Sequence, residues 1–406
     1  MKISNFRFLF TVLVAFCVLH LASLVVFANA QEGVKKDRYA IGVILPLSGR
    51  FADFGEEALK GVLLAAEIFK SAEQRINAKE IPNSRIEIII KDSMDNAVAA
   101  SNAVRELAED EGVAAIIGPL ISITAFEAAK KAQELKIPII TLSQREGLPQ
   151  IGDYVFRNFM TQSLQARLIA RYAVNTLKLK RIAILYPDNP YGRGLAAPFK
   201  DEIKIHNANV LTEEVYSDGQ TDFSREIRKL FKIKETEKKE GRRTIKTFEP
   251  TVSIDALYIP DYFDTVSLIV SHLAYFNIKG IKLLGSNGWN SKKLIEMSGK
   301  YVEDSVFVDG FFLDSQQHEV KTFTNRFYET YGIQPGILGA EAFDAASIIL
   351  NLLKEGNLKR EDIKRGLGKI SNLKGAAGTT SFNAEGEALK ELFILTIKNG
   401  EIVQLN

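Results

Sequence analysis

The stretch Val113–Gly147, VAAIIGPLISITAFEAAKKAQELKIPIITLSQREG, contains one complete strand–helix–strand repeat. Residues 113–117 and 137–142 are short and almost wholly apolar, whereas residues 124–135 carry apolar side chains at helical spacing. Apolar strands that alternate with helices are typical of a parallel sheet covered on both faces. The stretch therefore predicts an α/β fold.

The same alternation continues on both sides of this stretch, and a second series begins after residue 160. Two series of similar size in a chain of 406 residues predict two doubly wound, Rossmann-like lobes. Helices are expected at 55–71, 98–111, 162–177, 191–204, 262–276, 319–331, 339–355 and 360–370. Further strands are expected at 40–45, 86–90, 181–186, 208–216, 254–259 and 281–284, and a hairpin turn at Asn399-Gly400.

The segment Lys232–Lys246, KIKETEKKEGRRTIK, is the most charge-rich part of the chain. It mixes basic and acidic side chains and contains no aromatic residue, which favours a solvated extension of a helix at 222–232. A basic docking patch is the alternative interpretation.

The first thirty residues have the pattern of a secretory signal peptide. Lys2 and Arg7 form a basic start, residues 8–27 are almost wholly apolar, and Ala28-Asn29-Ala30 supplies small residues for cleavage. The apolar run is also long enough to span a bilayer, so an uncleaved anchor is the competing interpretation. Cys17, the single cysteine, lies in this segment, so we expect an exported chain without disulfides.

Charge and motif content exclude several classes of function. Without Lys2 and Arg7 the formal charge falls to +2 − 2 = 0, which argues against nucleic acid or an acidic membrane surface as the main partner. The four histidines lie apart from one another, and no metal-site, catalytic-triad or Walker A pattern is present. The G-x-G-x-x-A match at 192–197 is separated from its strand by residues 187–191, which disfavours a dinucleotide site. We therefore expect neither an enzyme nor a cofactor nor a metal ion.

Polar residues gather at the carboxyl ends of the expected strands, where open α/β sheets bind ligands. A helix that begins there also offers free N–H groups to an anion. The alternative is helix capping, since Thr124–Glu127 has the spacing of a capping box. The candidates in the first series are Ser48, Ser122, Thr124, Thr141, Ser143, Gln144 and Arg145. Those in the second series are Tyr191, Asp261, Tyr262 and Asn287.

Four stretches together resemble the type I periplasmic solute-binding proteins, in the leucine/isoleucine/valine-binding branch. They are IGVILPLSGRFADFGEEALKGVLLA, IIGPLISITAFEAAKKAQELKIPIITLS, RIAILYPDNPYGRGLA and LLGSNGWNSKKL, and the resemblance covers about residues 40–398. It implies two lobes that close by a hinge motion on a ligand held between them, and delivery to an ABC permease. The implied crossings lie near 160, 312 and 386, so that residues 39–159 and 313–385 form lobe 1, and 160–312 and 386–406 form lobe 2.

The resemblance also implies roles for individual residues. Phe54 corresponds to the family's cleft aromatic, Ser122 to its carboxylate-binding serine, and Tyr191 and Tyr262 to its cleft tyrosines. Two positions depart from the family pattern. Arg145 stands where a hydroxyl residue grips the ligand carboxylate, and Asn287 stands where an acidic residue pairs with the ligand ammonium.

These two departures favour an anionic or neutral ligand over an α-amino acid. A cation about 4 Å from a ligand ammonium costs roughly 4 kcal/mol at an effective dielectric of about 20. Without a carboxylate at position 287, only Asp261 remains to hold an ammonium group. We therefore predict a periplasmic, monomeric receptor for a small polar or anionic, amino-acid-like metabolite.

A second resemblance gives the alternative function. ITLSQREG, DALYIPDYFDTVSLI and LLGSNGWNS also look like the substrate-binding-like domain of penicillin-binding-protein activators. That likeness implies an envelope regulator or scaffold of peptidoglycan synthesis, with a penicillin-binding protein as its partner.

Overall fold

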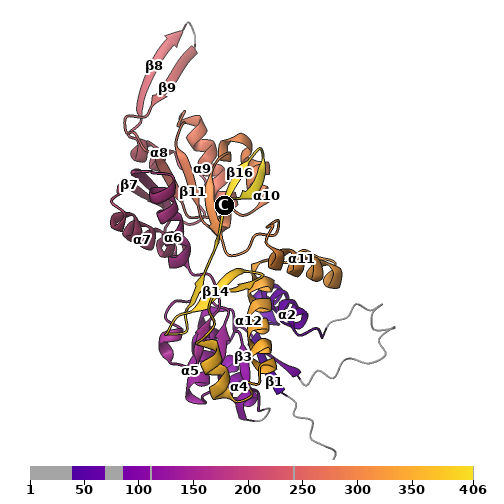
Figure 1. The fold of residues 1–406 in the computed structure, drawn as a ribbon. Coiled ribbons are helices and arrows are strands. Elements are labelled where there is room, and N and C mark those ends of the chain that lie inside the picture. Colours follow the sequence, from indigo (N-terminus) through magenta and orange to yellow (C-terminus); the bar gives the residue numbers. More distant parts are fainter. Residues whose placement is uncertain (1–38, 69–85, 110–111, 241–242, 406) are drawn as a thin grey trace, which may run out of the picture.

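The computed structural model describes residues 39–68, 86–109, 112–240 and 243–405. The expected signal peptide at 1–30 lies outside these ranges. Two lobes, each built around its own sheet, are stacked along the long axis of the molecule and joined by a narrow waist (Figure 1). No helix within the described ranges has the length and apolar character needed to cross a membrane.

Lobe 1 is built on a parallel sheet of order β2-β1-β3-β4-β5. Successive side chains of a strand point to opposite faces, so Ile44 packs with one pair of helices while Val43 packs with the other pair. The strands are β1 (Tyr39–Leu45), β2 (Ile86–Asp92), β3 (Ala115–Ile117), β4 (Ile139–Thr141) and β5 (Val155–Arg157). One helix pair is α4 (Ala97–Glu109) with α5 (Ser122–Glu134). The other pair is α2 (Ala52–Ala65) with α12 (Ile337–Lys354), and α13 (Arg360–Leu367) packs on the same face.

Lobe 2 is built on a seven-stranded sheet of order β17-β16-β12-β11-β10-β6-β7. Five strands are parallel: β6 (Arg181–Pro187), β7 (Asn209–Tyr216), β10 (Ala256–Ile259), β11 (Lys282–Gly285) and β12 (Val306–Asp309). The hairpin of β16 (Phe393–Lys398) and β17 (Glu401–Gln404) adds two antiparallel strands and turns at Asn399-Gly400 as predicted. Helices α6 (Gln162–Arg171) and α7 (Pro190–Ile205) cover one face; α8 (Ser224–Phe231), α9 (Phe263–Tyr275) and α10 (Lys292–Ser298) cover the other.

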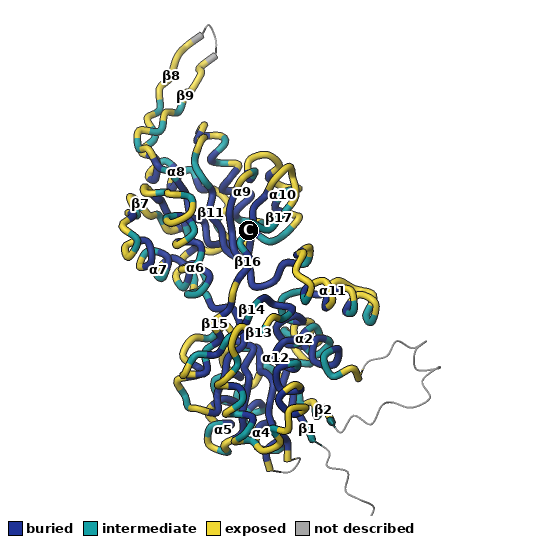
Figure 2. The backbone as a smooth tube through the Cα atoms, viewed as in Figure 1, coloured by how far each residue is buried: buried dark blue, intermediate teal, exposed yellow. Residues whose placement is uncertain are grey.

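The charge-rich segment is a β-hairpin, so the predicted extension of the preceding helix is wrong. Helix α8 ends at Phe231, Lys232 adopts a left-handed conformation with φ of 44°, and β8 (Lys234–Glu240) then pairs antiparallel with β9 (Arg243–Glu249). The hairpin projects from lobe 2, and most of it is exposed (Figures 1 and 2). At its base, Phe248 packs on Tyr275 and Phe276, with ring centroids 5.3 and 5.0 Å away. Cross-strand pairing and this aromatic anchor outweigh the modest helix propensity of the mixed charges.

The chain passes between the lobes three times. It leaves β5 for α6 through residues 158–161, and β12 for α11 (His318–Tyr331) through residues 310–317. A small sheet, β13 (Leu373–Gly375), β14 (Gly378–Phe382) and β15 (Ala388–Lys390), precedes the last passage. Gly386, in the loop between β14 and β15, accepts a hydrogen bond from the N–H of Arg157, and this bond attaches the small sheet to lobe 1. We therefore propose residues 391–392 for the third crossing, in place of the expected position near 386.

A buried network ties two of these crossings together. Lys390, at the end of β15, forms an ion pair with Glu341 of α12, and neither side chain is exposed to solvent. The ammonium group also donates to Asn158 Oδ1 at 3.2 Å, and Asn158 donates to the Glu341 carbonyl at 3.1 Å. The first crossing, the third crossing and α12 therefore share one polar cluster.

Asp309, at the second crossing, makes stability depend on pH. Burial raises the pKa of its carboxyl from 3.8 to about 7, although Asn290 Nδ2 and the Gly310 N–H both donate to it. The native state therefore holds a proton that the unfolded chain releases, and the free energy of unfolding should fall as pH rises from about 4 to 7. At about 1.4 kcal/mol per pKa unit, the full change is at most about 4 kcal/mol. Denaturant titrations at pH 4.5, 6.0 and 7.5 should show a flatter profile for Asp309→Asn; equal slopes for both proteins would contradict this.

Candidate functional site

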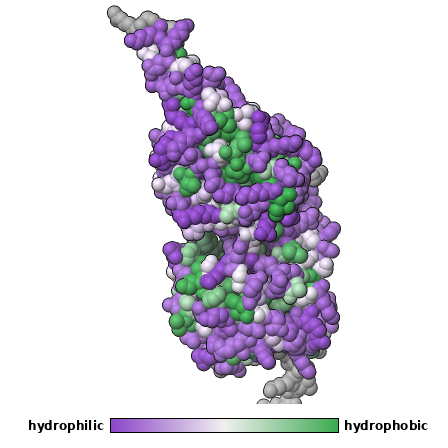
Figure 3. Space-filling model, turned by 90° about the vertical axis from the view of Figure 1, so that its left-hand side faces the viewer, coloured by the Kyte–Doolittle hydropathy of each residue, from purple (hydrophilic) through white to green (hydrophobic). Residues whose placement is uncertain are grey.

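The carboxyl ends of both sheets face the waist. In lobe 1, the end of β5 leads directly into the first crossing, and β1, β3 and β4 run parallel to β5. In lobe 2, the end of β12 leads into the second crossing, and β6, β10 and β11 run parallel to β12. The loops that carry the predicted site residues therefore lie at the two edges that face each other. Figure 3 shows the surface hollowed between the lobes.

Arg145 is the central cation of the lobe 1 edge. It lies in the loop after β4, and its guanidinium carbon is 3.9 Å from the ring centroid of Phe126 on α5. Its Nη1 donates to the Ser122 carbonyl at 3.3 Å, which links the β3 and β4 loops. Among the described residues, no carboxylate lies within ion-pair distance of this half-buried guanidinium. A cation held over a ring, with no carboxylate partner, is suited to an anionic ligand.

The loop that carries Arg145 rests on a second, buried arginine. Arg157 of β5 donates through Nη1 to the carbonyls of Gln144 and Arg145, the former at 3.2 Å. Its Nε lies 2.9 and 3.1 Å from the two carboxylate oxygens of Glu387. The Arg157 side chain is only 3% exposed. This bidentate pair therefore fixes the backbone on which Arg145 is displayed.

Four predicted hydroxyl residues use their side chains within lobe 1. Thr141 donates to the Phe156 carbonyl at 3.1 Å, and Ser143 Oγ accepts from the Arg145 N–H at 3.3 Å. The Ser48 hydroxyl bonds to Asp92; burial alone would raise the pKa of that carboxyl, but this bond and backbone N–H donors lower it. Thr124 donates to the Ile121 carbonyl at 2.9 Å and lies inside α5, which begins at Ser122 without a side-chain cap. The alternative interpretation of Thr124–Glu127 as a capping box is therefore wrong.

The remaining lobe 1 candidates are open to solvent. Ser122 and Gln144 are exposed, and Phe54 is 48% exposed. The Phe54 ring stacks on Phe51 with centroids 6.0 Å apart. The guanidinium of Arg50 covers Phe51 at 4.3 Å and pairs with Asp95 at 3.6 Å. Phe54 therefore offers an aromatic surface at the amino-terminal start of α2.

The lobe 2 edge carries a stacked pair of tyrosines. The rings of Tyr191, at the start of α7, and Tyr262, just before α9, lie 4.8 Å apart with an interplanar angle of 19°. The Tyr191 hydroxyl donates to Asn287 Oδ1 at 2.7 Å and lies 3.0 Å from the Ser286 hydroxyl. Tyr262 is 50% exposed, so its outer face is open. The structure thus brings Tyr191, Tyr262 and Asn287 together.

Asp261 is beside this pair but faces the interior. Tyr216 donates its hydroxyl to Oδ2 at 2.5 Å, and the Tyr262 N–H donates to Oδ1 at 2.8 Å. The residue is 7% exposed, and burial raises the pKa of its carboxyl. Its oxygens are therefore engaged within lobe 2.

Comparison with known proteins now gives the family. The family model described as periplasmic binding protein matches residues 38–401. The chain belongs to the periplasmic binding protein family. A Leu/Ile/Val-binding protein homolog from Brucella melitensis is 29% identical over 217 residues, which is 52% of this chain and 57% of that protein. The chain thus matches little more than half the length of this curated relative.

Solved structures agree with this periplasmic binding protein fold. One is a branched-chain amino acid transporter substrate-binding protein from Streptococcus pneumoniae, in complex with isoleucine. It is 24% identical to this chain, the TM-score is 0.63, and the match covers 91% of this chain and 100% of that one. Another is a solute-binding protein of an ABC transporter from Rhodopseudomonas palustris in complex with 3,4-dihydroxybenzoic acid: 18% identity, TM-score 0.64, covering 91% and 96%. At these identities the likeness shows the fold alone. Together with the family match, it confirms the predicted type I architecture.

Two residues of this periplasmic binding protein fold that support the site were not predicted from sequence. Arg157 ends β5, at a position where no strand was expected from the sequence, and Gln165 lies within α6, away from the expected strand ends. Gln165 Oε1 accepts from the Asn287 N–H at 3.1 Å, and its buried Nε2 has no partner among the described residues. A polar residue in an otherwise apolar helical face is the one signal that would have found Gln165.

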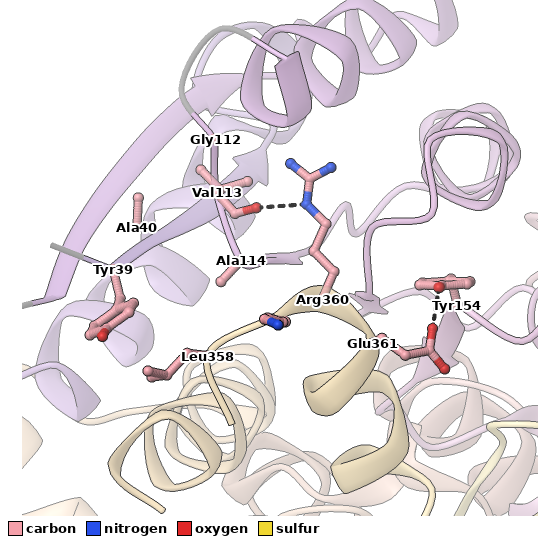
Figure 4. Close-up of a pocket in the computed structure, with 10 residues that line it drawn as sticks. Tyr39, Ala40, Gly112, Val113, Ala114, Tyr154, Leu358, Arg360 and Glu361 are labelled. Atoms are coloured by element: carbon pink, nitrogen blue, oxygen red, sulfur yellow. Dashed lines mark hydrogen bonds between the residues drawn. The ribbon is translucent and has the colours of Figure 1, made fainter. Parts of the chain in front are cut away.

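A pocket of about 480 Å³ at the far end of lobe 1 is not part of this site (Figure 4). It lies beside Tyr39 and Ala114, at the amino-terminal edge of the sheet. Arg360 contacts it, but this guanidinium donates to the Val113 carbonyl at 3.1 Å and to the Ala108 carbonyl at 2.5 Å. Arg360 therefore satisfies one carbonyl of α4 and one in the segment before β3. Within the described ranges, no group of His, Cys, Asp and Glu side chains could hold a metal ion.

Proposed function

We propose that this periplasmic binding protein is exported, binds a small polar or anionic metabolite between its lobes, and presents it to an ABC permease. The observation that carries the proposal is Arg145, a guanidinium without a carboxylate partner among the described residues, at an edge that faces the other lobe. Export by cleavage after Ala30 belongs to the same proposal.

The candidate residues are divided between the two lobes, which supports a binding site that closes around its ligand. The cation and Ser122 belong to lobe 1, whereas Tyr191, Tyr262 and Asn287 belong to lobe 2. A ligand that contacts both sets stabilises the form in which the lobes approach. The ligands of the two solved relatives, isoleucine and 3,4-dihydroxybenzoic acid, both carry a carboxylate, which is the group that Arg145 would bind in this chain.

Arg145→Ala should weaken binding of the preferred metabolite by about 100-fold or more, because a hydrogen bond between two charged groups is lost. The preferred metabolite is first found by a thermal-shift screen of amino acids, dicarboxylates, aromatic acids and peptidoglycan fragments. Ligand at about 100 times its Kd adds roughly 2.7 kcal/mol of stability. Calorimetry then compares wild type, Arg145→Ala and the control Arg105→Ala, an exposed arginine on α4 of the same lobe.

Two outcomes would contradict the proposal. Equal affinity of Arg145→Ala and wild type would remove Arg145 from the site. A screen without any stabilising solute, together with co-purification of a penicillin-binding protein, would favour the envelope-scaffold function.

A further inference from the structure

We infer that the ligand is an aromatic monocarboxylic acid without an ammonium group. This inference rests on the proposed function and specifies its ligand class. It depends on which side chains of the two facing edges remain able to contact a ligand.

Among the candidate site residues in the described ranges, no carboxylate is free to hold an ammonium ion. The two oxygens of Asp261 already accept hydrogen bonds from Tyr216 and from the Tyr262 N–H, and the residue is 7% exposed. The acceptor oxygen of Asn287 is used by the Tyr191 hydroxyl. An α-ammonium group would therefore lie near the Arg145 charge without a compensating acceptor on lobe 2, and its desolvation would be unfavourable.

The guanidinium groups near the site point to a single carboxylate. Three other arginines near the site are already paired with acids: Arg50 with Asp95, Arg157 with Glu387, and Arg193 with Asp188. Arg145 is thus the guanidinium of these loops that has no acidic partner among the described residues. A dicarboxylate would leave its second carboxylate without a guanidinium partner among these arginines, whereas a monocarboxylate matches Arg145.

Aromatic surfaces on both lobes point to a planar ring. Tyr262 is 50% exposed and is held by stacking on Tyr191, so its orientation is fixed before a ligand binds. Phe54, 48% exposed, presents a second ring from lobe 1. Aromatic rings prefer offset-stacked or edge-to-face contact with other rings, so both surfaces suit an aromatic ligand. Asn287 retains its Nδ2 as a donor, since only its oxygen is engaged by Tyr191, and can donate to a hydroxyl or carbonyl on such a ring.

Calorimetry with four acids tests the inference: 4-hydroxybenzoate, cyclohexanecarboxylate, succinate and leucine. The first two share one charge and a six-membered ring, so their difference isolates aromaticity. We expect 4-hydroxybenzoate to bind at least tenfold more tightly than the other three. Tyr262→Ala should weaken its binding about tenfold, whereas Tyr301→Ala, which removes a 52% exposed tyrosine elsewhere on lobe 2, should leave it unchanged.

The possible failures separate the two proposals. Tighter binding of leucine or succinate overturns the aromatic ligand class while leaving a solute receptor in place. Equal affinity of wild type and Tyr262→Ala for 4-hydroxybenzoate also overturns it, because the ring would not be the contact. If none of the four acids binds and no solute in the wider screen does, the receptor function is overturned as well.

Discussion

Lys390→Met is expected to lower the free energy of unfolding by about 3–5 kcal/mol, the range seen when one partner of a buried ion pair is removed. Lys390 and Glu341 are both fully buried, and Lys390 is the only cation paired with that carboxylate within the described ranges. Burial already raises the pKa of Glu341 to about 7 with the lysine in place. Without the ammonium charge, the carboxylate would be left buried without a counter-charge.

Denaturant unfolding at pH 8 and pH 5 measures this effect. The loss should be larger at pH 8, because at pH 5 Glu341 can take up a proton and avoid a buried charge. The double variant Glu341→Gln/Lys390→Met should recover most of the stability. Lys374→Met, an exposed lysine in the same small sheet, is the matched control. A Lys390→Met protein as stable as wild type at both pH values would show that the pair contributes nothing to the fold.

Arg157→Met should combine a loss of stability of about 3–5 kcal/mol with a loss of ligand affinity. It removes the partner of Glu387 and the donor to the Gln144 and Arg145 carbonyls. Arg145 would remain in the chain, but its backbone would no longer be fixed. Arg157 is therefore a positioning residue: it has no predicted contact with the ligand.

Two further variants separate the effect of Arg157 on stability from its effect on ligand affinity. Arg157→Lys keeps the charge but cannot reproduce the two-pronged contact, so it should recover part of the stability and little of the affinity. Arg157→Met/Glu387→Gln should recover stability without affinity, since no charge is left buried and the carbonyls still lack a donor. Affinity equal to wild type in a folded Arg157→Met protein would show that Arg145 needs no such support.

Much of the fold could be predicted because the strands at the centre of the two sheets are almost wholly apolar. Strands such as Arg181–Pro187 and Ala256–Ile259 are covered on both faces, so they appear in the sequence as nearly continuous apolar runs. The hairpin at residues 234–249 lies outside both cores and contains no such apolar run. Its charges fit either a helix or a strand, and the deciding contact, Phe248 on Phe276, joins residues 28 positions apart.

The position of the candidate site could be predicted from the sequence, but the hydrogen bonds already made by its side chains could not. Ends of parallel strands gather at one edge, so the polar residues after the strands could be assigned to it. Which of their groups are already bonded depends on tertiary contacts: Thr141 bonds to Phe156 of the neighbouring strand, and Asp261 bonds to Tyr216. These partners lie 15 and 45 residues away, and no spacing in the sequence indicates them.

The three chain crossings have a thermodynamic consequence for affinity. A ligand that needs both lobes binds fully only to the closed population, so its apparent Kd equals the intrinsic Kd divided by the closed fraction. We expect substitutions of residues near the crossings, such as Asn158 and Asp309, to alter that fraction. Evolution can therefore tune how much solute this protein retains by changing the resting balance between open and closed forms, while the selectivity of the contact residues stays the same.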